Sequence, residues 1–254
     1  MKRVLALAAI LLLFTSAPAR ADNPFGPGEK LSYDLYWTFV PAGSATLETL
    51  DQEQVEGHPA LHFRALAQSL PFVDKFYKVR DSIESWVDPG VTRALLYKKD
   101  QNEGDYVRHY LVRFDRNGNV AYRYSKGALK NAVLIPFGTF DPLSMLFLFR
   151  TKDLHVGMEF AAPVTDGEKS ITGTARVVRR ETIKTKAGEF DTLLVEPDVR
   201  DIGGVFRKSP DATLQVWITN DERRIPVRVQ SKVVVGHFSM ELTGYTPPKN
   251  KAAH

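Results

Sequence analysis

The sequence predicts an all-β, mainly antiparallel protein: a single curled sheet or open β-barrel of about a dozen strands, with one apolar helix in or against it. Apolar and polar residues alternate with a period of two over most of the chain, which is the pattern of strands that bury one face. Segment 141–152 departs from this alternation because it is apolar on nearly every side. Such a helix cannot lie with half its circumference in water.

The first half of the chain carries seven predicted strands, at 31–39, 45–50, 60–68, 79–88, 93–99, 106–114 and 120–124. Asn117-Gly118 predicts a two-residue hairpin turn before the last of them, because both positions tolerate a positive φ. Leu70–Lys78 interrupts the alternation and predicts a short helical turn or loop. Its bulky residues at 70–73 either cover a cavity as a lid or pack down as core.

The helix is predicted from its two ends as well as from its composition. Asp141 can cap it, since its carboxylate accepts hydrogen bonds from the free N–H groups of the first turn. Pro142 suits the first helical position, and Arg150 lies near the negative end of the helix dipole. We expect this helix inside the curled sheet, between layers, or against a ligand or partner.

The second half predicts six more strands, at 159–164, 170–185, 190–196, 213–219, 225–235 and 238–244. No Gly- or Pro-rich linker and no clean repeat divides the chain. We therefore expect one β-rich domain over 22–254 with its core at 27–246. The polar tail 247–254 is expected to be disordered.

The N-terminal segment 1–21 has the three parts of a secretory signal peptide: a positive start, an apolar run and small residues before a cleavage site between Ala21 and Asp22. The apolar run is about 11 residues, whereas roughly 20 span a bilayer. The mature chain is therefore expected to be exported and not membrane-spanning. It has no cysteine and no Asn-x-Ser/Thr acceptor site, which favours a bacterial periplasm.

Charge and motifs exclude several function classes. Without Lys2, Arg3 and Arg20 the net charge falls from +4 to +1, so a general attraction to nucleic acid is not expected. The six histidines form no metal-binding pattern, and the chain lacks a thiol, a G-x-S-x-G elbow and a phosphate-binding loop. We predict no cofactor, no metal and no enzymatic activity.

One polar pair and a set of aromatics are the candidate ligand-binding residues. Asp81 and Arg108 lie on apolar strand faces, where a charge is costly unless it is paired. They either face a common interior as an ion pair or ligand anchor, or lie on strands whose inside and outside are reversed. The aromatics are core residues or the lining of a pocket. The full set of candidates is Trp37, Phe72, Phe76, Tyr77, Asp81, Trp86, Arg108, Leu146, Phe147 and Trp217.

Three segments in a fixed order carry a resemblance to a known family. They are Gly28-Glu29-Lys30-Leu31-Ser32-Tyr33 running on to Ala42-Gly43, then Asp141-Pro142-Leu143-Ser144 ending at Arg150, then Val216-Trp217-Ile218-Thr219-Asn220-Asp221 followed by Arg223-Arg224-Ile225-Pro226-Val227. Over about residues 27 to 246 the chain resembles the domain-of-unknown-function 3108 family of exported bacterial proteins. The resemblance implies a mostly antiparallel β fold and an envelope location. It implies no activity and no catalytic residues.

Three functions are compatible with these patterns. The first is a non-catalytic binding or carrier module for an apolar envelope molecule such as a lipid or acyl chain. The second is a structural or interaction protein of the envelope, docking a protein partner through edge strands or the charged turn 221–224. The third is an enzyme acting on envelope polymers, for which no catalytic constellation is found.

Overall fold

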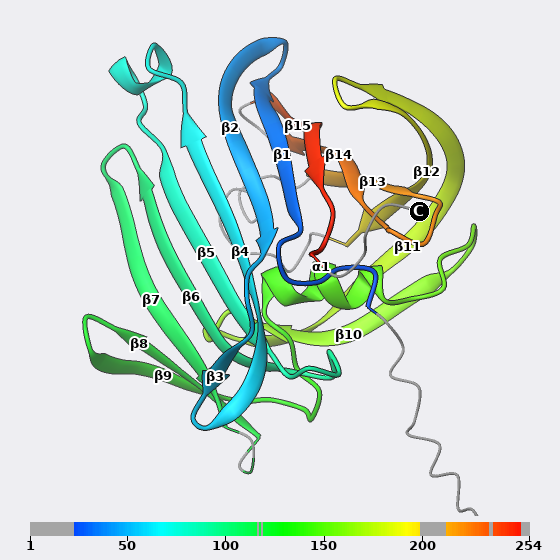
Figure 1. The fold of residues 1–254 in the computed structure, drawn as a ribbon. Helices are drawn as coiled ribbons and strands as arrows, with labels where there is room; N and C mark the ends of the chain where they lie inside the picture. The colour runs from blue at the N-terminus through cyan, green and yellow to red at the C-terminus, as the bar shows by residue number, and fades with distance from the viewer. Residues whose placement is uncertain (1–22, 116, 118, 199–211, 234–235, 250–254) are drawn as a thin grey trace, which may run out of the picture.

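A computed structural model describes residues 23–115, 117, 119–198, 212–233 and 236–249. The predicted signal peptide and the predicted cleavage site lie outside these residues, as does half of the predicted Asn117-Gly118 turn. Within the described residues, fifteen strands form one antiparallel sheet that curls around the helix α1 (Figure 1). This confirms the predicted all-β curled sheet.

The elements follow the predicted order. The first half contains β1 Lys30–Trp37, β2 Val40–Thr49, β3 Glu53–Val55, β4 His58–Ser69, the short 3₁₀ helix η1 Val73–Lys75, β5 Arg80–Val87, β6 Ala94–Glu103, β7 Tyr106–Phe114, β8 Val120–Ser125 and β9 Ala128–Leu134. The second half contains α1 Pro142–Arg150, β10 Glu159–Thr165, β11 Ser170–Thr185, β12 Gly188–Pro197, β13 Thr213–Thr219, β14 Pro226–Val233 and β15 Gly236–Thr246. The sequence analysis missed β3, which has three residues, and β9, which is exposed at most positions and so lacks the alternation.

The sheet runs β10-β11-β12-β13-β14-β15-β1-β2-β4-β5-β6-β7-β8-β9, with β3 paired to β4. Its two ends, β10 and β9, do not pair with each other, so the barrel stays open. Side chains bridge the gap instead. The Asn131 amide on β9 donates to the carbonyls of Gly167 and Glu168, both at 3.0 Å, and Arg123 on β8 lies 2.6 Å from Glu168. Gly167 has φ +83°, and a Cβ there would collide with Arg123.

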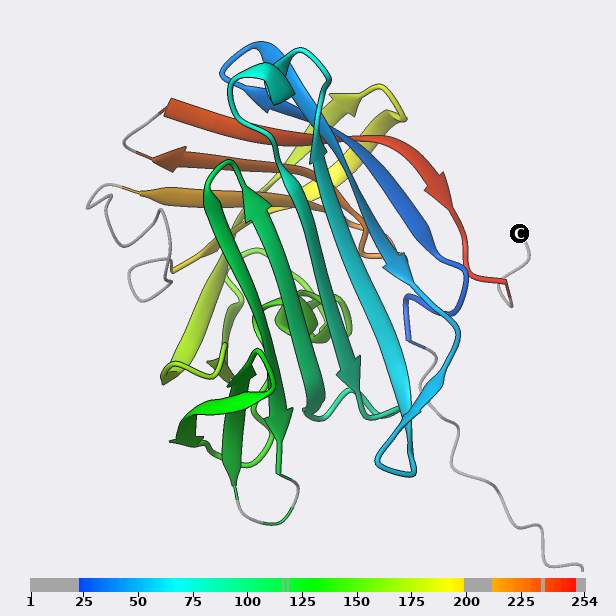
Figure 2. The ribbon, with the colours of Figure 1, turned by 90° about the vertical axis from the view of Figure 1, so that its left-hand side faces the viewer.

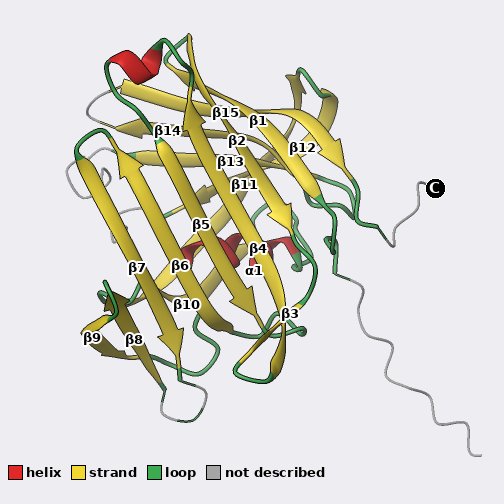
Figure 3. Cartoon of the chain, turned by 60° about the vertical axis from the view of Figure 1, so that its left-hand side comes forward, coloured by secondary structure: helices red, strands yellow, loops and turns green. Residues whose placement is uncertain are grey.

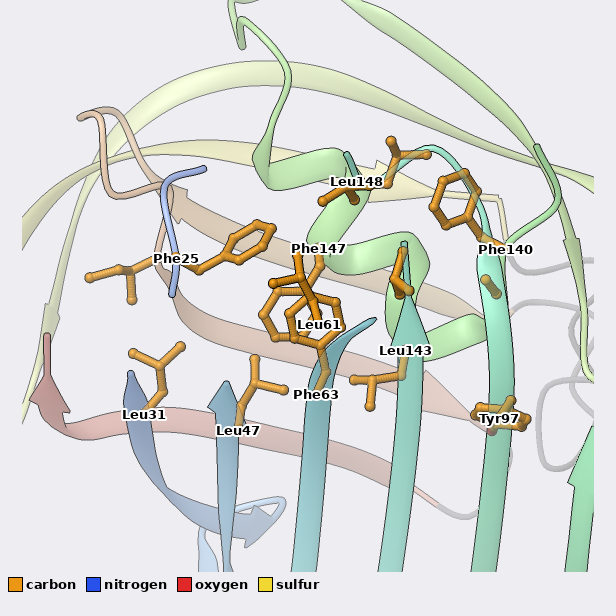
Figure 4. Packing of buried hydrophobic residues seen from close by; sticks show 14 of the residues in the cluster. Phe25, Leu31, Leu47, Leu61, Phe63, Tyr97, Phe140, Leu143, Phe147 and Leu148 are labelled. Carbon is orange, nitrogen blue, oxygen red and sulfur yellow. The ribbon is translucent and has the colours of Figure 1, made fainter. Parts of the chain in front are cut away.

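Helix α1 begins and ends where its capping residues predict. Asp141 accepts from the backbone N–H groups of Leu143 and Ser144, and Ser144 completes a capping box. The helix lies in the concave side of the sheet, as Figure 2 shows looking through the strands. Phe147 is fully buried and stacks on Phe63 of β4, with ring centroids 3.6 Å apart (Figure 4). The apolar helix is therefore the centre of a packed core.

A buried ion pair ties the end of the helix to two distant segments. The Arg150 guanidinium makes two 2.8 Å hydrogen bonds to the Glu29 carboxylate and donates to the carbonyls of Arg223 and Arg224. These residues come from the three segments that carry the family resemblance. The charged turn after β13 is thus partly anchored by its backbone, while Asp221 pairs with Arg223 at 2.5 Å. These buried hydrogen bonds give the three segments a structural role in the fold without a bound ligand.

The C-terminal tail differs from the expectation at its start. Pro248 is buried against Gly26, the Lys249 N–H donates to the Pro27 carbonyl, and the Lys249 ammonium lies 2.7 Å from Asp51. The prediction of disorder is therefore wrong for residues 247–249, because the tail completes the packing around the first strand. Residues 250–254 lie outside the described residues.

Candidate functional site

The inner face of the sheet, the face that contacts α1, changes character along the strands. On β4, β5 and β6 the inner-face residues nearer the helix are buried, whereas those two to four positions farther on are half-buried; on β7 burial extends to Tyr110, and Arg108 beyond it is exposed. Period-two geometry and the strand register place both sets on the same face. We call them the helix half (Leu61, Phe63, Ser85, Val87, Tyr97, Val112 and Phe114) and the open half (Ala45, Ala65, Ala67, Asp81, Ile83, Lys99, Gln101 and Arg108).

The open half has an apolar side and a polar side. Ala45 on β2 lies opposite Ala67 on β4, and Ile83 on β5 lies opposite Ala65, so small and medium apolar groups form one side. Lys99 on β6 lies opposite Ile83, and Gln101 lies opposite Arg108 on β7. The surface therefore fits a molecule that is apolar along part of its length and polar elsewhere.

Asp81 sits at the boundary between these two sides. It lies opposite Ala67 and accepts a hydrogen bond from the backbone N–H of Asn102 at 2.9 Å. Burial raises the pKa of its carboxyl to about 6; the Asn102 hydrogen bond lowers it and the neighbouring Glu103 raises it. Glu103 in turn accepts from the Gln101 amide at 2.6 Å and the Tyr77 hydroxyl at 3.4 Å. A carboxyl that changes charge near pH 6 thus lies on a partly open surface.

Arg108 shares the inner face with Asp81 but does not pair with it. Its guanidinium lies 3.5 Å from Glu168, on the turn after β10, and 5.1 Å from the centre of the Tyr106 ring. The ion pair, one of the alternatives left open for Asp81 and Arg108, is therefore not present in the structure, although both side chains belong to the open half. The strand β6 stands between β5 and β7, and Arg108 reaches toward the seam between β8 and β10 instead.

Exposed apolar residues gather at the end of the sheet beyond the open half. Of thirteen large apolar side chains that are exposed among the described residues, nine lie in the connections or strand ends at this one end. We call these nine the rim. They are Trp37, Phe39 and Val40 between β1 and β2, Phe72, Phe76 and Tyr77 between β4 and β5, Tyr106 and Val107 at the start of β7, and Phe238 near the start of β15.

Backbone hydrogen bonds hold the connections of the rim together. Thr38 N–H donates to the His237 carbonyl at 2.7 Å, Leu70 N–H to Ala42 at 2.9 Å, and Gly104 N–H to Lys78 at 2.8 Å. Figure 3 shows η1 at the upper end of the strands, with α1 well below it. The rim is therefore a set of linked, well-placed turns, and its exposed aromatics are presented by an ordered scaffold.

The structure brings six of the ten predicted residues to this end: Trp37, Phe72, Phe76, Tyr77, Asp81 and Arg108. The segment at 70–73 does not pack down as core, since Pro71 and Phe72 are exposed. The candidate set does not include five of the rim residues: Phe39, Val40, Tyr106, Val107 and Phe238. Phe39 is 91% exposed because it lies in the turn between β1 and β2, although the predicted strand 31–39 included it.

The other four predicted residues lie elsewhere. Phe147 is core, and Leu146 is half-buried against that core. Trp86 is buried on the other face of β5, where it stacks on His62 and its indole N–H donates to Glu53 at 2.9 Å. Trp217 is buried, and its N–H donates to Glu181 at 2.8 Å. These side chains have partners within the protein.

A second concave feature lies beside α1 and the edge strand β10. It is an open hollow of about 580 Å³. Its lining is Gly90, Val91, Thr92, Phe140, Leu148, Thr151, Lys152, Glu159, Phe160, Ala161 and Ala162. Within the described ranges no three His, Cys, Asp or Glu side chains are grouped to hold a metal ion. None of the helices formed by the described residues is long and apolar enough to cross a bilayer.

Comparison with solved structures supports the fold alone. The chain is similar to a β-barrel-like protein of domain of unknown function DUF1849 from Brucella abortus, with a TM-score of 0.52, 10% identity, and coverage of 87% of this chain and 98% of that chain. A protein described as exported, with a YmcC-like fold, from Bacteroides fragilis has a TM-score of 0.38, 10% identity, and coverage of 88% and 97%. That score carries no argument about fold or function.

No curated protein matches the sequence. A family model does, over residues 32–243, which is most of the 254-residue chain and includes most of the segments on which the resemblance was based. Its description is a protein of unknown function, DUF3108. The family match agrees with the antiparallel fold and assigns no chemistry to any residue. The chain therefore belongs to the DUF3108 family of proteins of unknown function.

Proposed function

We propose that this protein is an exported, non-catalytic binding or carrier module of the bacterial envelope. Its ligand is an apolar or amphipathic molecule, such as a lipid or an acyl chain, held on the open half of the inner face. The observation that carries this proposal is the loss of burial along β4 to β7, from Phe63 and Val112 to Ala67 and Arg108. The apolar side of the open half stays half-buried on the inner face of the sheet, and apolar surface left open in this way often marks a binding site.

The residue types on the open half match such a ligand. The short side chains of Ala45, Ala65 and Ala67 and the larger one of Ile83 form a half-buried apolar surface. An alkyl chain laid there gains the hydrophobic free energy of removing both surfaces from water. Lys99 and Gln101, one strand away, offer hydrogen-bond donors for a polar head group.

Mass spectrometry of organic extracts tests this function. The mature protein, residues 22–254, is purified gently from a bacterial periplasm, and we expect a lipid or other apolar molecule in stoichiometric amount. In Ala67→Trp the indole fills the space above β4, so the molecule should be lost. Ala132→Trp on β9 is the matched control, because Ala132 is exposed and far from the open half. An empty wild-type protein, or equal loss from both variants, contradicts the proposal.

A second candidate function, docking of a protein partner, is favoured by the edge strand β10. The Phe140 N–H donates to the Pro163 carbonyl, and the Thr165 N–H donates to the Phe140 carbonyl, both at 2.9 Å. Alternate residues of a strand direct their backbone groups to the same side, so those of Glu159 and Ala161 face the same edge. Among the described residues no strand pairs with this edge at Glu159 and Ala161, and the 580 Å³ hollow is lined by both of them. An extended peptide could add there as a further strand.

The shape of the hollow favours a single peptide segment over the edge of a second folded sheet, because residues 90–92 and the end of α1 form its other wall. A photo-crosslinker at Glu159 in the exported protein, followed by mapping of the linked peptide, tests this. We expect Ala161→Pro to abolish the adduct, since it removes one edge N–H, and Ala161→Val to keep it. Adducts that persist in Ala161→Pro contradict strand addition.

A further inference from the structure

We propose that the rim docks on the surface of a lipid bilayer that contains anionic lipids. The first argument is the concentration of exposed apolar area. Single exposed apolar residues are normal on a protein surface, but Phe39 is 91% exposed and Phe76 is 87% exposed at the same end of one sheet. Seven further rim residues surround them. Exposing this apolar surface to water is unfavourable in free energy, and contact with an apolar phase removes that penalty.

The second argument is the charge around the aromatics. Lys75 and Lys78 flank Phe76-Tyr77, and Lys232 lies on β14 near Phe238; all three are exposed, and none forms an ion pair with a described residue. Two nearby carboxylates are paired with cations, Asp74 with Arg80 at 2.7 Å and Asp34 with Lys186 at 2.5 Å, whereas Glu103 and Asp105 form no ion pair with a described residue. The rim therefore combines apolar tips with three exposed lysines, which complement anionic head groups.

The third argument decides between a membrane and a protein partner. The rim residues come from four separate connections, and they are mostly aromatic. Trp and Tyr favour the bilayer interface, where an aromatic ring meets apolar tails and the polar group stays wet. Elements bound in this way penetrate about 5–10 Å, which the length of a turn can reach. A bilayer can accept these exposed side chains without a complementary pocket for each of them, whereas a protein partner would need such pockets.

Docking would turn the open half toward the membrane. Its use in loading or unloading a lipid rests on the proposed function, because only a protein that carries an apolar molecule needs that orientation. The docking itself does not rest on it. The Ala67→Trp variant separates the two, since it fills the open half and leaves the nine rim residues unchanged.

Vesicle sedimentation of the mature protein tests docking. The probes are vesicles of phosphatidylethanolamine and phosphatidylglycerol at three to one, and vesicles of phosphatidylcholine alone. We expect binding to the first and weaker binding to the second. Phe76→Asp should weaken binding at least tenfold, and Phe137→Asp should leave it unchanged. Phe137 is the matched control because it is 70% exposed but lies between β9 and α1, away from the rim.

Tryptophan fluorescence gives a second readout from the same samples. Trp37 is 53% exposed, whereas Trp86 and Trp217 are 8% and 5% exposed, so a blue shift on adding vesicles reports on the rim. The combined Lys75→Gln and Lys78→Gln variant should lose binding to the anionic vesicles roughly fivefold per lysine, and little to phosphatidylcholine. This pattern would support attraction to the head groups.

Three results would overturn the proposal. They are no sedimentation of the wild-type protein with either vesicle, equal weakening by Phe76→Asp and Phe137→Asp, and binding without a fluorescence shift. Cross-linking of the rim to a protein partner in the absence of vesicle binding would also overturn it. If Ala67→Trp docks but carries no lipid, both proposals stand; if the wild type docks but is empty, only the proposed function fails.

Discussion

The two halves of one inner face differ in what covers them. In the helix half, Phe63 is buried under Phe147 of α1, and Tyr97 and Val112 are buried in the same core cluster. In the open half, Ala67, Lys99 and Arg108 lie on the same strands and the same face, and the helix does not reach them. The strands are continuous across the boundary. Burial on this inner face is thus set by the segments that pack over it, including the nine-residue helix α1 and the turn at Gly167, and the strand pattern alone does not set it.

Polar groups show the same division. The helix half buries Asp141 completely, but its carboxylate accepts from the Ser85 hydroxyl at 2.5 Å and from two backbone N–H groups. In the open half, Asp81 has one backbone donor and a neighbouring carboxyl. Buried polar groups need a full set of partners, whereas a half-exposed surface can keep groups free for a ligand.

Removing the aromatic centre of the helix half should have the largest effect. Phe147→Ala deletes a fully buried ring that stacks on the Phe63 ring and meets the Phe25 ring edge-on, with the centroids of the Phe25 and Phe147 rings 4.9 Å apart. We expect the free energy of unfolding to fall by about 4 kcal/mol, from lost transfer free energy and the cavity left behind. Urea unfolding measures it. A loss below about 1 kcal/mol would mean that the helix is not the centre of the core.

Breaking the buried ion pair should have the next largest effect. Glu29→Ala leaves the fully buried Arg150 guanidinium without its carboxylate and should cost about 3 kcal/mol. The paired change Glu29→Leu with Arg150→Met should recover part of this loss, because an apolar pair needs no charge compensation. Urea unfolding of the three proteins checks the order; a double variant less stable than Glu29→Ala would contradict it.

Truncation in the open half should cost much less. Ile83 is only half-buried, so we expect Ile83→Ala to lower the free energy of unfolding by about 1 kcal/mol. The same variant should weaken retention of an apolar ligand, measured by mass spectrometry of the purified protein. A stability loss as large as that of Phe147→Ala would show that the open half is packed in solution, and the contrast between the halves would disappear.

The smallest effect is a dependence on pH. The pKa of Asp81 is about 6 in the folded protein, above the ordinary value of 3.8. Its contribution to stability is therefore fully present below pH 4 and is lost as pH rises through 6. Asp81→Asn should remove this loss and stabilise the protein at pH 7 by about 1 kcal/mol, less than the full shift implies because solvent screens a half-exposed carboxyl.

Urea unfolding of both proteins from pH 4 to pH 7 measures the Asp81 effect as a difference between two curves. The difference isolates this carboxyl from the other titrating groups, except Glu103, which is next to it and interacts with it. Parallel curves would show that Asp81 has an ordinary pKa and that the open half is more hydrated than the structure indicates.

Some features of this protein could be predicted because they depend on local chemistry. The cap at Asp141 could be predicted because its carboxylate accepts hydrogen bonds from the free N–H groups of the first helical turn. Strands β4 and β7 could be predicted because apolar and polar residues alternate along them. The pairing of Arg108 could not be predicted. Its partner Glu168 lies 60 residues away, on a turn that approaches β7 only because the sheet curls.

The sequence by itself determined the fold class, the helix and its ends, and the family, because alternation, capping and ordered segments are properties of neighbouring residues. Only the tertiary structure decided which half of the inner face is buried and which aromatics gather at the rim. Trp37 and Trp86 are both strand aromatics, yet one is exposed at the open end and the other is buried beside His62. The physical reason is that burial depends on what packs over a residue: residues of the β3 segment cover Trp86 on the outer face, and α1 covers only one end of the inner face.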